Sequence, residues 1–166
     1  MRLTGITRSN KGKPLFDVLI YLFENYLEEG LRPDQHVLER ELSLAGFETN
    51  DIDQAFTWLS GFDTLSESSY PDSLAQSHSV RFYARHEINK IDTESRGFLA
   101  FLEASGILNP VQREWVIDRI LALSERDVTL EQVKWIVLMV LWRQGQTLDY
   151  LLMEDLLSGD SNPHIH

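Results

Sequence analysis

The chain contains no cysteine, and it has no hydrophobic run long enough to cross a bilayer. Without thiols it cannot form a disulfide scaffold, a zinc ribbon, an iron–sulfur cluster or a cysteine nucleophile, which fits a reducing cytosol. The longest apolar stretch is Trp135–Trp142, eight residues bounded by Lys134 and Arg143. Because a membrane span needs about 20 apolar residues, we expect a buried helix here, in a cytoplasmic protein without a membrane partner.

Basic residues are scarce too, since 15 Lys and Arg stand against 26 Asp and Glu, a formal net charge of −11. This balance opposes general binding to nucleic acid or to an anionic membrane. The acidity is concentrated in residues 15–62, which hold ten carboxylates and two arginines. Residues 1–14 are instead basic, with four Lys or Arg and no acid.

The familiar catalytic motifs are missing as well. The sequence has no P-loop, no G-x-G-x-x-G turn, no H-E-x-x-H and no G-x-S-x-G elbow. No Glu is followed by His three residues later, which excludes the Glu-x-x-His pairs of di-iron bundles. His164 and His166 supply too few ligands for a metal site, which needs about three or four. We therefore expect no enzyme, metal, cofactor or small-molecule ligand.

What is present is helical periodicity, which predicts a mainly α fold. Three short helices are expected first, at 16–29, 33–45 and 50–60, with Thr49 or Asn50 capping the third and Gly61 ending it. Together they predict a compact trihelical lobe. The expected buried face of the second helix consists of Val37, Leu38, Leu42 and Ala45.

A second helical lobe is predicted after residue 80. Asp92 is placed to cap one helix, and Asn109 and Thr129 each begin a capping box with Gln three residues later. The segment 133–142 is apolar on all sides, so we place it at the centre of this helical bundle. A last helix is expected from Thr147. Apolar residues alternate with Arg and Tyr at 80–85, which predicts at most one short β element.

These patterns divide the chain into five parts. We predict a disordered basic extension at 1–14, the acidic trihelical lobe at 15–62, a serine-rich linker at 63–79, the helical bundle lobe at 80–157 and a disordered tail at 158–166.

The acidic lobe is the first candidate for a binding surface. Glu24 and Glu28 lie four residues apart on the first helix, with Glu29 adjacent, and they can meet a basic partner or simply face solvent. The trihelical pattern also resembles a helix-turn-helix, but the third helix exposes Asp51 and Asp53 and no base. A DNA-recognition helix needs basic side chains. We therefore favour a protein-interaction or adaptor role with a basic protein surface as partner.

The second candidate is a cluster of bases at the start of the second lobe. It contains Arg81, Arg85, Lys90 and Arg96, interleaved with Phe82 and Tyr83. Arginines among aromatic residues are typical of nucleic-acid contact, so a nucleic-acid-associated regulator is the alternative function. Glu87, Asp92 and Glu94 lie in the same stretch, and pairing within the fold explains the pattern equally well.

Several separated motifs resemble the Smg family of small bacterial proteins of unknown function. They are FDVLIYLFE at 16–24, RFY at 81–83, RGFL at 96–99 and VKWIVLMVL at 133–141. The resemblance covers about residues 15–157 and implies no activity or catalytic residues. Smg-like proteins typically begin Met-Phe-Asp-Val-Leu, which corresponds to Leu15–Leu19 here, so we predict that translation starts at Leu15 on a leucine codon.

Overall fold

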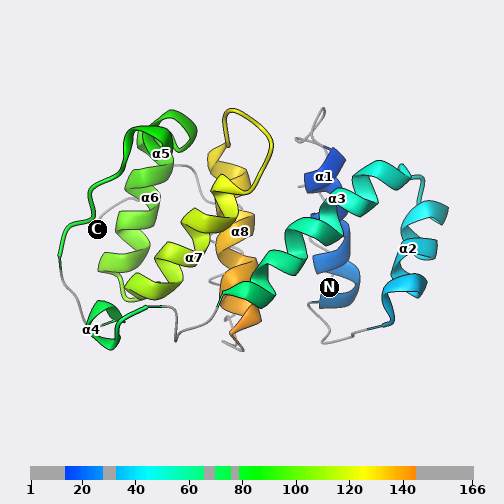
Figure 1. The fold of residues 1–166 in the computed structure, drawn as a ribbon, viewed down its shortest axis with the longest axis horizontal. Helices are drawn as coiled ribbons and strands as arrows, with labels where there is room; N and C mark the ends of the chain where they lie inside the picture. The colour runs from blue at the N-terminus through cyan, green and yellow to red at the C-terminus, as the bar shows by residue number, and fades with distance from the viewer. Residues whose placement is uncertain (1–13, 28–32, 66–69, 76–78, 145–166) are drawn as a thin grey trace. The chain divides into compact units, whose positions relative to one another are not determined.

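The computed structural model describes residues 14–27, 33–65, 70–75 and 79–144, and the fold is mainly α, as predicted (Figure 1). The chain divides into two compact units. The N-terminal unit is Met1–Thr64, and the C-terminal unit is Leu65–His166.

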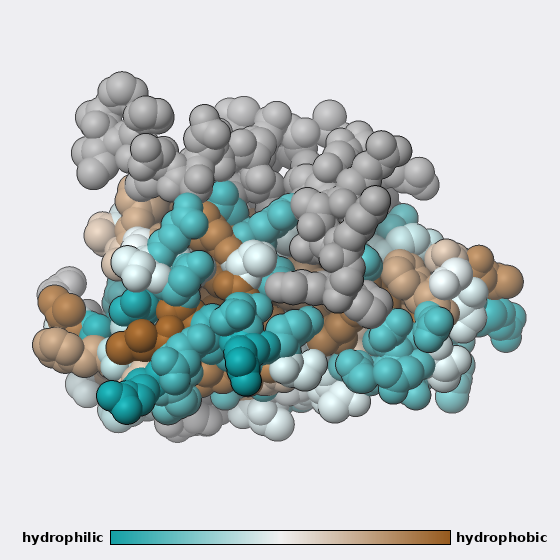
Figure 2. Space-filling view, turned by 90° about the horizontal axis from the view of Figure 1, so that it is seen from above, coloured by the Kyte–Doolittle hydropathy of each residue, from teal (hydrophilic) through white to brown (hydrophobic). Residues whose placement is uncertain are grey.

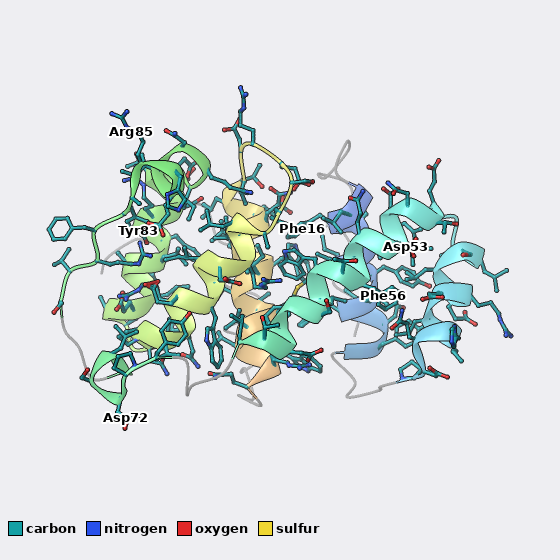
Figure 3. The ribbon with its side chains drawn as sticks, viewed as in Figure 1. Phe16, Asp53, Phe56, Asp72, Tyr83 and Arg85 are labelled. Carbon is teal, nitrogen blue, oxygen red and sulfur yellow. The ribbon has the colours of Figure 1, made fainter. Side chains whose placement is uncertain are left out.

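The N-terminal unit contains three α-helices and two short helices of other types. They are α1 (Pro14–Leu22), the π-helix η1 (Phe23–Leu27), α2 (Gln35–Leu44), α3 (Thr49–Ser60) and the 3₁₀-helix η2 (Gly61–Thr64). α1 and α2 both pack against α3. Phe16, near the start of α1, is fully buried (Figure 3). The first predicted helix is thus split, because it changes from α to π at Phe23.

The N-terminal cap of α3 differs from the prediction, whereas its C-terminal end agrees with it. Its N-cap residue is Glu48, so the cap expected at Thr49 or Asn50 was wrong. Gly61 is the C-cap residue of α3, as predicted, and it also begins η2, which buries Phe62. The ring of Phe62 meets Trp58 edge to face, with centroids 5.3 Å apart. This aromatic contact gives the chain a reason to continue as a helix past the glycine.

The buried face predicted for α2 was also wrong in part. Leu42 is fully buried, but Val37 is 44% exposed, and Ala45 is exposed as well. The helix ends at Leu44, and Gly46, just beyond the C-cap residue Ala45, has a φ of +99°. The N–H of Phe47 donates to the carbonyl of Leu42 at 3.1 Å, which is the pattern of a Schellman turn.

The C-terminal unit contains the remaining helices of the described chain. They are α4 (Asp72–Ala75), α5 (Arg85–Lys90), α6 (Thr93–Ala104), α7 (Pro110–Leu121) and α8 (Leu130–Arg143). α7 packs along α8, and α6 contacts both of them. Every residue from Gln132 to Leu141 in α8 is buried, which confirms its predicted place at the centre of the bundle.

The three predicted helix caps of this unit are confirmed. The carboxylate of Asp92 accepts from the N–H of Ser95 at 2.8 Å. Asn109 and Thr129 each form a reciprocal capping box with the glutamine three residues later. Their side chains satisfy N–H groups at the helix starts that have no partner within the helix.

Residues 63–79 are not purely a linker. They include the end of η2 and the short helix α4, which packs against α7 with Leu74 half-buried. Residues 80–84 form neither helix nor strand and run as an extended connection into α5 (Figure 1). The only β pairing within the described residues is an isolated parallel bridge between Ile91 and Val128. The predicted last helix from Thr147 and the tail lie outside the described residues.

Candidate functional site

The segment Ser79–Ala84 leads into α5 in an extended form. Its burial pattern is the reverse of what hydropathy favours, since its large apolar side chains are exposed and its arginine and tyrosine are partly buried. Arg81 and Tyr83 are half-buried, whereas Val80 is 81% exposed and Phe82 is 90% exposed. Figure 2 shows hydrophobic surface at the left edge of the view, where Figure 1 places this segment. An exposed apolar pair on a fixed segment is unusual and calls for a physical explanation.

Arg81 fixes the segment to two helices at once. Its Nη1 and Nη2 donate to the two carboxylate oxygens of Glu87 in α5, each at 2.9 Å. Its Nε donates to both oxygens of Glu114 in α7, at 2.8 and 2.9 Å. A planar guanidinium suits such fork-like pairing, which fixes direction as well as distance.

Tyr83, which is half-buried like Arg81, provides a second anchor for the segment. The guanidinium carbon of Arg81 lies 4.6 Å from the centre of its ring, and that of Arg96 in α6 lies 5.9 Å away. Both distances fall within the range of cation–π attraction. Burial raises the pKa of the Tyr83 phenol, so this side chain stays neutral.

The electrostatics of this cluster are those of a satisfied ion-pair network. Hydrogen bonds from Arg81 lower the pKa of Glu87 to about 2, against the opposing effect of burial, and the N–H of Ala84 adds a bond at 2.8 Å. The pKa of Arg81 is raised, chiefly by its bond to Glu87. Both groups are therefore charged at neutral pH, and neither is placed to exchange protons with a substrate.

The network extends into the bundle through Arg113. Its guanidinium lies 2.5 Å from the carboxylate of Glu103 in α6 and 3.8 Å from that of Glu114. The side chain of Arg113 is only 6% exposed, so its pair with Glu103 is a partly buried link between α6 and α7. Such partly buried pairs contribute more to fixing the arrangement of helices than surface pairs do.

The structure gives most of the predicted basic cluster an internal role. Lys90 donates to the carbonyl of Leu121 at 3.2 Å and to that of Leu123, close to the end of α7. Desolvation lowers the pKa of Lys90. Arg96 donates to the carbonyl of Ile91 at 3.2 Å and to Thr93 Oγ1 at 3.1 Å.

Arg85 is the exception in this cluster. It is exposed, projects away from the helices in Figure 3, and makes no ion pair with the described residues. Four bases close in sequence are therefore not one basic surface.

The predicted acidic residues are also dispersed. Glu24 lies half-buried in η1, while Glu28 and Glu29 lie outside the described residues. On α3, Asp51 is half-buried and Asp53 is exposed (Figure 3). Residues two positions apart on an α-helix point to roughly opposite faces. These two carboxylates therefore do not form one cluster.

Sequence reasoning missed the outer face of α2. Only Leu42 of this helix is buried, and Leu44 is 76% exposed. Val37, Glu41 and Leu44 are spaced i, i+4 and i+7, so they follow one stripe along the helix. The sequence did contain a sign of this exposed apolar surface, because Leu44 is apolar yet lies outside the predicted buried face of the helix.

Two negative findings bound the chemistry of the described residues. They contain no group of three or more His, Asp or Glu side chains arranged to hold a metal ion. None of their helices has the length and apolar character needed to span a membrane.

The described residues thus define a small, mainly α-helical protein with two units and a structural ion-pair network. The chain belongs to the family described as protein of unknown function DUF494, whose model matches residues 15–166.

Curated relatives carry the name "Protein Smg homolog", in agreement with the resemblance noted in the sequence. The one from Methylobacillus flagellatus is 43% identical over 152 residues, covering 92% of this chain and all of the relative. That from Aromatoleum aromaticum is 46% identical over 147 residues, which is 89% of this chain and 95% of the relative. That from Nitrosomonas europaea is 43% identical over 142 residues, or 86% and 93%. No solved structure matches the chain.

Proposed function

We propose that this protein is a non-enzymatic cytoplasmic interaction or adaptor protein whose N-terminal unit binds a basic surface of a partner protein. The observation that supports this best is the stripe on α2, where Val37 and Leu44 are exposed on either side of Glu41. A helix with a single buried residue and two exposed apolar ones offers surface that a partner can cover.

Charge indicates the chemistry of that partner. Among the described residues of the N-terminal unit, nine carboxylates stand against one base, Arg40. Glu41 and Asp53 are exposed and make no ion pair with the described residues. A surface with this excess attracts a basic partner and repels acidic ones, which raises the association rate as well as specificity.

The test is capture of partners by the immobilised full-length protein. We expect a basic protein to bind at about 0.1 M salt and to be released near 1 M, because the screening length falls from about 10 Å to about 3 Å. The double variant Glu41→Gln/Asp53→Asn should lose this protein. The matched control, Asp72→Asn/Glu94→Gln, removes two exposed carboxylates from the C-terminal unit and should retain it. Equal loss in both variants, or capture insensitive to salt, would contradict the proposal.

The alternative, nucleic-acid contact through Arg81, Arg85, Lys90 and Arg96, has less support. Three of these side chains already bond to carboxylates, carbonyls or a hydroxyl of the C-terminal unit. Phosphate binding needs bases that are free to replace counterions. An electrophoretic mobility shift with Arg85→Ala decides the matter, since this change leaves the internal bonds intact. Shifted nucleic acid that is lost in this variant would favour the alternative.

A further inference from the structure

The backbone of Val80–Tyr83 carries hydrogen-bonding groups that have no partner within the described part of the chain. The N–H groups of these residues find no acceptor among the described residues. From the described residues their carbonyls accept one bond, donated by Arg81 Nη1 to the oxygen of Phe82 at 3.4 Å. Extended backbone in this state is the template that strand addition requires, because a second chain can pair with the open groups.

The segment is also held in its extended form before any partner arrives. Arg81 is bonded to Glu87 and Glu114, and Tyr83 is packed beneath its guanidinium. A partner therefore does not need to order this stretch on binding, which removes much of the usual entropic cost.

The outward face of the segment offers apolar anchors. Val80 and Phe82 alternate with the anchored residues, so both project from the same face. Ile88 in α5 is 43% exposed and adds further apolar surface, six residues after Phe82 in the chain. Strand addition takes its affinity from main-chain bonds and its specificity from such alternate side chains.

Charge around the segment differs from that of the whole chain. From Ser79 to Lys90 no carboxylate is exposed, because the one acid, Glu87, is buried against Arg81. Arg85 is exposed beside the segment and has no ion-pair partner among the described residues. In a chain with a net charge of −11, this is a local surface to which an acidic group is drawn.

We propose that Val80–Tyr83 is a docking edge for an extended peptide segment of a partner protein, in which apolar residues alternate with acidic ones. The peptide pairs with the open backbone, sets its apolar side chains beside Val80 and Phe82, and places a carboxylate near Arg85. This surface lies on the C-terminal unit, so the proposal stands independently of the basic partner inferred for α2.

The experiment selects binders from a phage-displayed library of random peptides, each long enough to form a strand of about six residues. The full-length protein is the target, and Phe82→Asp is compared with Leu44→Asp. Both replace an exposed apolar side chain, but the second lies on α2. We expect enriched peptides with apolar residues at every second position and Asp or Glu between them. Phe82→Asp should weaken their binding about ten- to a hundredfold, the effect of losing one buried aromatic side chain.

Hydrogen exchange tests the backbone part of the proposal. The bound peptide should slow exchange of alternate amides within residues 80–83, those on the edge with which it pairs, and Leu44→Asp should bind as the wild type does. Random enrichment, binding unaffected by Phe82→Asp, or unchanged exchange at 80–83 would each overturn it. Self-association that depends on Phe82, measured by sedimentation, would assign the edge to a second copy and overturn it as well. A matching circular-dichroism melt of the two variants ensures that a loss of binding is not a loss of fold.

Discussion

Replacing Glu87 with Gln should destabilise the C-terminal unit and also change how its stability depends on pH. The pKa of Glu87 is lowered from 4.5 to about 2 by its bonds to Arg81. At about 1.4 kcal/mol per pH unit, this corresponds to ~3 kcal/mol at neutral pH. The Arg81 side chain is 19% exposed, so water screens the pair, and we expect Glu87→Gln to cost about 2 kcal/mol.

The sign of the pH dependence follows from the two protonation states. Between about pH 4.5 and pH 2 the unfolded chain binds a proton at Glu87 while the folded chain does not. The stabilisation is therefore fully present above about pH 5 and is lost as the pH falls toward 2. Glu87→Gln should remove this part of the acid sensitivity, so the two proteins should converge in stability as the pH is lowered.

Urea unfolding followed by tryptophan fluorescence measures both effects. Trp115, Trp135 and Trp142 lie in the C-terminal unit, and only Trp58 lies in the N-terminal one, so the signal is weighted toward the affected unit. Glu94→Gln is the control, because this exposed carboxylate makes no ion pair with the described residues and its loss should cost under about 0.5 kcal/mol. A Glu87→Gln variant that is as stable as the wild type at pH 7, or that loses stability in acid as steeply, would contradict a stabilising role for this ion pair.

Three further changes test the fold. Thr129→Ala removes the cap of α8 and should cost about 1 kcal/mol in urea unfolding, whereas an unchanged midpoint would contradict the capping box. Leu42→Ala should lower the melting temperature of the N-terminal unit, with a loss of about 2–4 kcal/mol in unfolding free energy, whereas Leu44→Ala should cost under about 0.5 kcal/mol. Similar losses in the two variants would mean that α2 packs through another face. Gly46→Ala should cost about 1–2 kcal/mol by thermal unfolding, because φ is +99° while no atom within 4 Å obstructs a methyl group, and a neutral result would exclude backbone strain at this turn.

Features with short-range causes were predictable from sequence. The capping boxes at Asn109 and Thr129 involve residues three apart, and the uniformly apolar 133–142 can be satisfied only by surrounding helices. The 3₁₀-helix η2, which follows α3 directly, was not predicted because it depends on the contact between Phe62 and Trp58, which glycine propensity does not reveal.

The ion-pair network could be anticipated only as a general alternative. Arg81 meets Glu87 six residues away, but its other partner, Glu114, is 33 residues away and becomes a neighbour only when α7 is in place. The alternation of apolar residues with Arg and Tyr at 80–84 indicated that the segment has two faces, but not which face is buried. Hydropathy favours burial of Val80 and Phe82. The structure instead buries the face with Arg81, because its guanidinium pairs with the carboxylates of Glu87 and Glu114.

The placement of Lys90 and Lys134 has a practical consequence for labelling chemistry. The sequence contains four lysines, and these two are the ones in the described residues. Lys90 is held by two backbone carbonyls, and Lys134 is 9% exposed, with its ammonium 5.8 Å from the centre of the Phe98 ring. Amine-reactive reagents should therefore modify both slowly in the native protein and quickly once the bundle opens. The rate of acylation at these two amines becomes a readout of unfolding, and surface labelling of the folded protein is better directed at its exposed carboxylates.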